Sequence, residues 1–295
     1  MAATFNPDNV LLQDRMTGDI PREYGTAIVN DVMQNSVMMN LAQYEPMTKQ
    51  EKSFGYLADG VGAYWVGEGE VIETSRPQWL EATMKAHKLG VIVPVSREFL
   101  QYTMSDFFTV VRPLIAEAFY KKFDEATILN VANPYTQSID ESATAAGNVI
   151  EGAIDYANFD ALVGSLEDED IDFNAFISRR NNNSAFRGLL DAQDNALFDR
   201  NNGTLDGAPI AYMNSTELPR GTVYGGDFNF ARYGIPYNLN YQISTDAQLS
   251  SITDEAGNPI NLFERELVAI RATMDVAFMV LKDEAFAKIE APAGA

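Results

Sequence analysis

The stretch "GVGAYWVGEGEVIETSRPQWLEA", Gly60–Ala82, decides how the rest of the chain is interpreted. It contains Trp65 and Trp79, the only tryptophans in the chain, fourteen residues apart among glycines and glutamates and without a lysine. Tryptophan rings bury a large apolar area when they are covered, and this segment offers little material to cover them. We therefore expect the two rings to find their cover outside the segment.

The residues on either side of this stretch have the alternation of β-strands. Residues 53–58 read "SFGYLA", and residues 80–95 alternate between apolar and polar side chains. The apolar set is even-numbered up to Ala86 and odd-numbered from Leu89 onward. A slip of one residue moves every side chain to the opposite face, so we expect a bulge or twist near 88–90. The two segments predict a two-stranded ribbon with the tryptophan stretch at its far end, and an isolated ribbon is marginally stable at best.

Two helices are predicted around this ribbon. Residues 26–43 place their apolar side chains mostly on one helical face, and Pro46 closes the segment. Residues 105–130 form the strongest helical pattern, with apolar side chains spaced three and four residues apart. Pro113 lies inside this second helix and should kink it or mark the first turn of its main segment.

The remaining chain is predicted as shorter elements. Residues 1–25 read as an extended arm, and from Phe159 onward helices and strands alternate. We expect a buried strand at 173–178, a helix at 183–193 and a turn-rich hairpin at 203–214. The final part of the chain, from Leu262 onward, is predicted as long strands that return to the earlier sheet.

Composition excludes several classes of protein. The chain has 295 residues, 46% apolar content, no cysteine and a net charge of −21 at pH 7. Such a charge repels nucleic acid, which argues against a sequence-specific DNA reader. The absence of cysteine excludes disulfides and thiolate chemistry. No secretory signal is recognisable, and the apolar runs are too short to span a bilayer.

The sequence offers no catalytic, cofactor-binding or metal site. His87 is the only histidine and falls on the polar face of a predicted strand, so a Ser–His–Asp arrangement has little support. The acidic run Glu167–Asp172 resembles the start of a calcium loop, but Phe173 stands where the loop needs glycine. A hydrolase with two carboxylates remains an alternative, because such pairs are set by geometry rather than by sequence spacing.

In their order along the chain, the motifs resemble those of the tailed-bacteriophage major capsid proteins, whose fold is shared with encapsulins. The similar segments are "VMQNSVMMNLAQYEPM" for a first helix, "AYWVGEGEVIETSRPQWLEATMKAHKLGVIVPVSREFL" for an extended loop and its return, and "FFTVVRPLIAEAFYKKFDEATI" for a long spine helix. Further along, "NAFISRR", "TLDGAPI" and "YGGDF" are similar to the central domain.

The resemblance implies an α+β phage major-capsid fold. Its parts would be an N-terminal arm at 1–25, an extended β-ribbon loop at 54–96 and an axial domain at 155–255. A discontinuous peripheral domain would comprise 26–53, 97–154 with the spine helix, and 256–295 with the final strands.

The resemblance also implies a function and its residues. Copies would assemble as pentamers and hexamers into the icosahedral head, inside the host bacterial cytoplasm, and enclose packaged double-stranded DNA without sequence-specific binding. On the extended loop, the expected inter-subunit contacts are Tyr64, Trp65, Glu68, Glu70, Arg76 and Trp79. The spine helix would contribute Phe107, Val111, Leu114, Phe119 and Phe123, and the axial domain Arg179, Arg180, Asp227 and Phe228.

Partners follow from the same resemblance. We expect a separate scaffolding protein, a portal and a decoration protein, but no membrane and no cofactor. Some relatives cross-link their shells through a lysine on the extended loop, and here no lysine lies between Ser53 and Met84. We therefore expect shells without covalent links. An encapsulin-like compartment that holds cargo enzymes is the alternative from the same fold.

Overall fold

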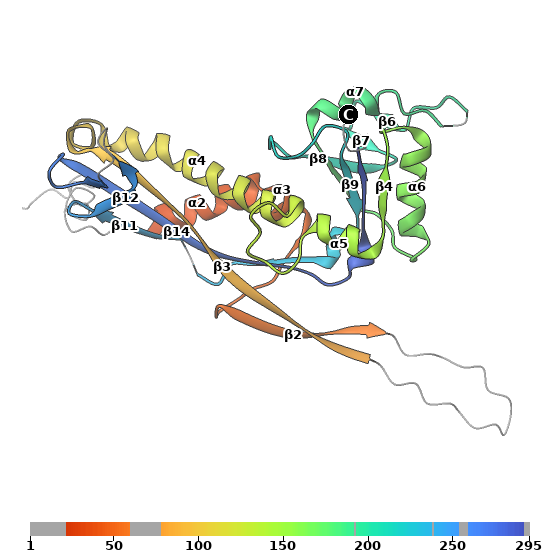
Figure 1. Cartoon of the computed structure of the whole chain (residues 1–295), viewed down its shortest axis with the longest axis horizontal. Helices are drawn as coiled ribbons and strands as arrows, with labels where there is room; N and C mark the ends of the chain where they lie inside the picture. The colour runs from red at the N-terminus through yellow and green to blue at the C-terminus, as the bar shows by residue number, and fades with distance from the viewer. Residues whose placement is uncertain (1–21, 60–77, 192, 238, 254–258, 292–295) are drawn as a thin grey trace, which may run out of the picture.

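The computed structural model describes residues 22–59, 78–191, 193–237, 239–253 and 259–291. Within these ranges the backbone alone is described for 22–27, 56–59, 78–80, 98–110, 241 and 253. The chain builds two larger sheets with helices against them and one small two-stranded sheet, so the fold is mixed α+β as expected. Figure 1 shows an elongated body that holds the first sheet at one end and the second at the other, with a ribbon projecting from it.

The first sheet is arranged around its central strand, β14. Its order is β1-β10-β14-β3-β2, and β11 also pairs with β14. All of these pairs are antiparallel except β1 with β10. The strands are β1 (Gln43–Tyr44), β2 (Glu51–Asp59), β3 (Gln78–Ser96), β10 (Ala231–Gly234), β11 (Asn240–Ser244) and β14 (Leu267–Val280).

Strand β3 changes its buried face without a bulge, which corrects the expectation for residues 88–90. Its pairing with β14 runs unbroken from Ala86 opposite Ala277 to Ser96 opposite Leu267. Ala86 packs with Met47 on one face of the sheet, whereas Leu89 packs on the opposite face against the main core. The phase of the apolar pattern flips because the cover changes sides, not because the register slips.

Three helices cover the main-core face. They are α2 (Arg22–Asn35), α3 (Val37–Leu41) and α4 (Arg97–Leu129), which has Pro113 inside it. The helix expected at 26–43 is therefore interrupted, and the long helix begins eight residues before the expected Ser105. Phe119 and Phe123 of α4 are buried in the core with side chains of β14.

The second sheet has the order β4-β15-β9-β5-β8-β7-β6. Its central strands are β9 (Val223–Gly226) and β5 (Ala175–Ser178), and every residue of both is buried. The others are β4 (Val149–Glu151), β6 (Phe198–Asp199), β7 (Thr204–Leu205), β8 (Ala208–Tyr212) and β15 (Phe286–Glu290). The glycines of "YGGDF" are required here, because a Cβ on Gly226 would lie 2.3 Å from the carbonyl oxygen of Ala285.

Short elements complete the fold. Helices α5 (Ile139–Ala146) and α6 (Tyr156–Glu167) pack against β15, and β12 (Gln248–Thr253) pairs with β13 (Pro259–Asn261). The hairpin expected at 203–214 is confirmed by the pairing of β7 with β8. The helix expected at 183–193 is wrong in extent, because α7 covers only Asn183–Phe186. Single 3₁₀ turns are η1 (Arg180–Asn182), η2 (Phe228–Phe230) and η3 (Asp283–Ala285).

Two expected domain boundaries do not coincide with the sheets. β10 and β11 fall within the range 155–255, but they pair with β14 in the first sheet. β4 and β15 fall outside that range, but they belong to the second sheet. The chain therefore crosses between the two sheets more often than the linear division implies.

Candidate assembly surfaces

The ribbon is anchored at its base and projects from the body beyond it (Figure 1). Residues 51–59 of β2 pair with residues 78–85 of β3, with a register shift between Leu57 and Asp59. At the base, Met84 and Ala86 are buried in a small cluster with Met47. Further out, Ser53 and Thr83 hydrogen bond side chain to side chain at 2.8 Å, and both are exposed. Core packing therefore fixes where the ribbon starts.

Most of the loop contacts expected from the sequence cannot be placed. Tyr64, Trp65, Glu68, Glu70 and Arg76 lie outside the described residues. The backbone of Trp79 pairs with that of Leu57 in the ribbon, whereas the Trp79 side chain lies outside the part of the chain that the structure describes.

The expected residues of the spine helix divide between its two sides. Phe119 and Phe123 are buried, and the Phe123 ring meets Phe278 edge to face at 6.3 Å between centroids. Val111 is partly buried against the core. Leu114 was expected in the same apolar stripe but is 57% exposed, which corrects that assignment. The side chain of Phe107 lies outside the described residues.

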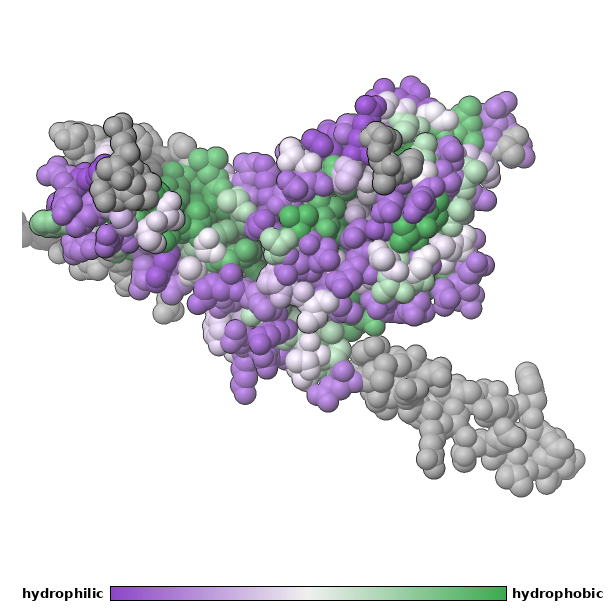
Figure 2. All heavy atoms as spheres, viewed as in Figure 1, coloured by the Kyte–Doolittle hydropathy of each residue, from purple (hydrophilic) through white to green (hydrophobic). Residues whose placement is uncertain are grey.

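Leu114 belongs to an apolar patch on the outer side of α4. Ala118, one turn further along, and the neighbouring Pro113 are also exposed. Figure 2 shows apolar surface above the middle of this helix. Because α4 covers the sheet with its other side, this patch has no cover within the described part of the chain and is available to another molecule.

A buried carboxylate joins α4 to the break between α2 and α3. Asp124 accepts hydrogen bonds from the Ser36 hydroxyl at 2.6 Å and from the N–H groups of Val37 at 2.9 Å and Met38 at 3.1 Å. Burial raises the pKa of Asp124 to about 6, and these three hydrogen bonds offset only part of that effect. Nearer the start of α4, Arg112 holds Asp31 of α2 through two hydrogen bonds of 2.7 and 2.8 Å.

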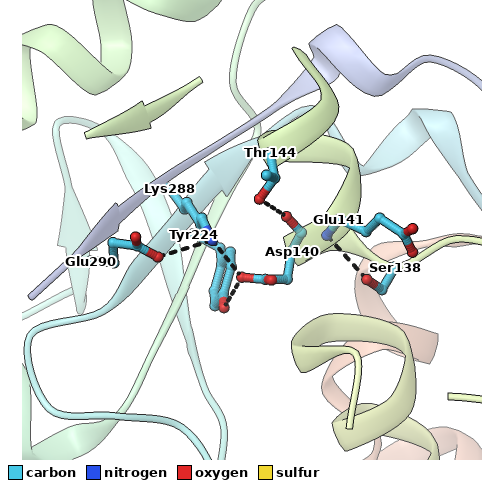
Figure 3. A network of polar contacts seen from close by, with 7 residues as sticks. All are labelled: Ser138, Asp140, Glu141, Thr144, Tyr224, Lys288 and Glu290. Carbon is cyan, nitrogen blue, oxygen red and sulfur yellow. Dashed lines mark hydrogen bonds and ion pairs between the residues drawn. The ribbon is translucent and has the colours of Figure 1, made fainter. Parts of the chain in front are cut away.

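A second polar cluster fastens the second sheet to α5 (Figure 3). Lys288 of β15 lies 2.9 Å from Asp140 of α5 and 2.9 Å from Glu290, with only 8% of its side chain exposed. The Tyr224 hydroxyl donates a hydrogen bond of 2.9 Å to the same oxygen of Asp140. Thus one carboxylate connects α5, β9 and β15.

The pKa directions in this cluster indicate a structural fastening. Burial alone would lower the pKa of Lys288, but hydrogen bonds to Glu290 and Asp140 raise it above its usual value. Burial and the neighbouring Asp140 raise the pKa of Tyr224 as well. A lysine nucleophile needs a lowered pKa, so this ammonium remains charged and holds its partners.

This cluster also lines the wall of a pocket of about 420 Å³. Other lining residues are Glu151, Glu217, Leu129 and Pro219. Two of its carboxylates, Asp140 and Glu290, are already paired with Lys288.

The expected axial-domain residues hold the fold locally. Asp227 accepts a hydrogen bond of 2.6 Å from the Asn174 side chain, and Phe228 is fully buried against Phe286. The Arg180 guanidinium lies over the Tyr212 ring at 5.2 Å, and Arg179 donates to the Leu218 carbonyl oxygen at 3.5 Å.

Other candidate chemistry has structural explanations. His87 packs edge-on against the Tyr135 ring at 5.4 Å and is half-buried, which corrects its placement on a solvated face. The acidic residues of the run 167–172 are all exposed, and no group of three metal-ligating side chains occurs in the described ranges. Over the same ranges, no helix is both long and apolar enough to cross a membrane.

Sequence reasoning missed Ser36, Asp124 and Lys288. Ser36 carried a signal, since serine directly before an apolar run is a frequent helix N-cap. Lys288 interrupts the apolar residues of "FAKIE", which marks a charge that must find partners if it is buried. Asp124 carried no such signal, because it lies among Lys121, Lys122 and Glu125 in "KKFDEATIL".

Comparisons with known proteins agree on one family. The model of the "Phage capsid family" matches residues 19–291. The major capsid protein of Staphylococcus phage 80alpha is 48% identical over 287 residues, which cover 97% of this chain and 89% of that protein. A solved structure from Microbacterium phage Oxtober96 aligns with a TM-score of 0.70 at 26% identity, covering 87% of this chain and 91% of that one.

A third relative shows the fold alone. It is described as "Capsid of empty GTA particle computed with C5 symmetry" and aligns with a TM-score of 0.65 at 18% identity. The alignment covers 88% of this chain and 90% of that chain.

Proposed function

This chain belongs to the phage capsid family and is the major capsid protein of a tailed-phage head, and from that premise we propose that its copies assemble as pentamers and hexamers whose ribbons clasp neighbouring copies. Its place is the capsid of the virion, and its role is structural rather than enzymatic. The proposal concerns how the copies hold one another.

The observation that carries this proposal is the projecting ribbon. Its base is buried by Met47, Met84 and Ala86, whereas its outer part extends away from the body (Figure 1). A two-stranded ribbon gains little stability by itself in water, so a long one must gain it by contact. In head-to-tail rings each subunit both lends and receives such an element.

We further propose the division into parts that the resemblance implied, adjusted to the sheets. The first sheet with α2, α3 and α4 would form the peripheral domain. The second sheet, including β4 and β15, would form the axial domain at the centre of each ring. Arg179 and Arg180, which follow β5, would then belong to the axial domain.

The partners also remain proposals. A scaffolding protein, a portal and a decoration protein would bind the shell, and packaged DNA would be enclosed without specific contacts. A net charge of −21 favours this arrangement, because walls that bind phosphates would resist filling. An encapsulin-like compartment is less well supported, since the 48% identity over nearly the whole chain is to a phage protein.

The test removes the outer ribbon. Replacing residues 61–78 by a short glycine-containing turn should leave the folded protomer intact, because the described core residues lie elsewhere. The variant should fail to form closed shells in negative-stain images, while its thermal midpoint as a dispersed chain stays within a few degrees of the parent. Normal shells from the shortened chain would refute the proposal that the ribbons hold neighbouring copies together.

A milder variant keeps the length of the ribbon. Trp65→Ala combined with Trp79→Ala removes both rings, and Glu68→Gln combined with Glu70→Gln is the matched control that retains them. If aromatic anchors make the contact, the first pair should lower the yield of shells far more than the second.

A further inference from the structure

The break between α2 and α3 consists of one residue. Ser36 has φ −71° and ψ 129°, an extended conformation between two helices that would otherwise join. Its own N–H still donates to Val32 at 2.9 Å, as in a continuing helix. A change of ψ at Ser36 would therefore suffice to convert the bent pair into one helix from Arg22 to Leu41.

Both sides of this break are capped by specific side chains. On the α3 side, Asp124 accepts from Val37 and Met38, and the Ser36 hydroxyl oxygen accepts from the N–H of Met39 at 3.1 Å. On the α2 side, the Asn40 amide donates to the carbonyl oxygen of Gln34 at 3.0 Å. All three N–H groups of the first turn of α3 are thus satisfied without the preceding helix.

We propose that the α2–α3 junction is a two-state joint, held bent by the Asp124 carboxylate, about which α2 turns. In the alternative state Val37, Met38 and Met39 would donate to the carbonyls of α2 one turn earlier. These three N–H groups have acceptors in either state, so the balance is set by Asp124 and by the packing of α2.

The packing of α2 against α4 opposes the straight state. Ile28 and Val32 are buried against α4, and the Asp31–Arg112 pair holds α2 from the side. Straightening the joint exposes these side chains unless another surface covers them. In the isolated chain the bent state therefore dominates, and release requires that Asp124 lose its hold.

The hydrogen bonds that Asp124 accepts suit a contact that can be released rather than a permanent one. All three donors to Asp124 are uncharged groups, so no cation offsets its burial through these bonds. A buried carboxylate held only by neutral donors pays a large desolvation cost. Asparagine at this position keeps one oxygen but replaces the other by an NH2 donor, so the N–H of either Val37 or Met38 loses its acceptor in the bent state, which favours the straight state.

The experiment measures the direction of α2 in the unassembled full-length chain. The chain contains no cysteine, so Asn30→Cys on α2 and Ala118→Cys on α4, both exposed, accept two spin labels without background. Pulsed electron–electron double resonance should give one distance in the parent. Asp124→Asn should add a second, longer distance in about 10% of molecules or more.

Val37→Pro provides the rescue. Proline suits the first position of α3, and it confines the preceding residue to the extended region that Ser36 already occupies. It also prevents a continuous helix. Added to Asp124→Asn, it should remove the second distance and restore the single one.

The control and the contrary outcomes are specific. Glu117→Gln makes the same carboxylate-to-amide change on a half-buried pair of α4 and should leave one distance. A single distance in folded Asp124→Asn, or a second distance that Val37→Pro does not remove, would overturn the joint. If Asp124→Asn does not fold, Ser36→Ala takes its place, and one distance there overturns the proposal equally. Because the chain is unassembled, the result does not depend on the ribbon proposal.

Discussion

The two halves of β3 differ in which strands they pair with and in what buries their apolar side chains. Residues 86–96 pair with β14 and place alternate side chains under α4, inside the main core. Residues 78–85 pair only with β2 in the described part of the chain and leave the body as a ribbon. The same alternation of apolar and polar residues runs through both halves.

This difference shows that alternation of apolar and polar residues predicts a strand, but not which part of the structure buries its apolar face. In the inner half the cover is α4, which follows directly in sequence. In the outer half it is Met47 at the base, and beyond that we propose a neighbouring copy. The inner half should therefore carry the stability of the protomer, and the outer half the stability of the shell.

The largest expected effect comes from removing the cover of the inner half. Phe123 is 1% exposed and packs with Tyr135 and Phe278. Phe123→Ala should lower the free energy of unfolding by about 3–5 kcal/mol, because it removes apolar burial and leaves a cavity. Urea unfolding of the dispersed chain measures this, with Phe123→Leu as the milder control. A loss under about 1 kcal/mol would show that α4 is not the essential cover.

A smaller effect is expected from Asp124, which joins α4 to the α2–α3 junction, and this effect depends on pH. The pKa of Asp124 is raised by burial from 3.8 to about 6, so the folded chain binds this proton more tightly than the unfolded chain. The stability that this residue contributes is fully present below about pH 4 and is lost as pH rises through 6. Two pKa units correspond to about 3 kcal/mol.

The measurement is the difference in unfolding free energy between the parent and Asp124→Asn across pH 4 to 8. That difference should shift against the parent as pH rises and level off above about pH 7. A difference that is flat over this range would contradict the raised pKa.

The smallest effect is expected in the outer half. Lys85 lies 3.4 Å from Glu51 across the ribbon, and both side chains are more than half exposed. Lys85→Ala should change the free energy of unfolding by about 0–1 kcal/mol, since exposed pairs are weak and screened. A loss above about 2 kcal/mol would mean that the ribbon contributes to the protomer's own stability, contrary to the comparison.

The sequence predicted the elements whose periodicity is long and local. The ribbon strands, the long helix, the strand at 173–178 and the hairpin at 203–214 all follow from spacing and turn residues. The family resemblance rested on the order of these elements, and the match over residues 19–291 confirms it.

The misses share a physical cause, which is a partner distant in sequence. The break at Ser36 depends on Asp124, 88 residues away, while the local apolar period continues through it. Leu114 satisfies the helical period but lies on the side of α4 that faces away from the sheet. Spacing alone cannot identify such partners.

The crossings between the two sheets have a mechanical consequence. The chain passes from β9 to β10 through η2 and from β14 to β15 through η3, and the two crossings are joined to each other. The Leu281 N–H donates to the Phe230 carbonyl oxygen at 2.9 Å and the Asp227 N–H to that of Ala285 at 3.0 Å, and the Phe228 ring meets the Phe286 ring edge to face. Two linkers tied side by side resist torsion better than either alone. A force applied to one sheet would therefore be transmitted to the other through both linkers, with little relative rotation of the two sheets.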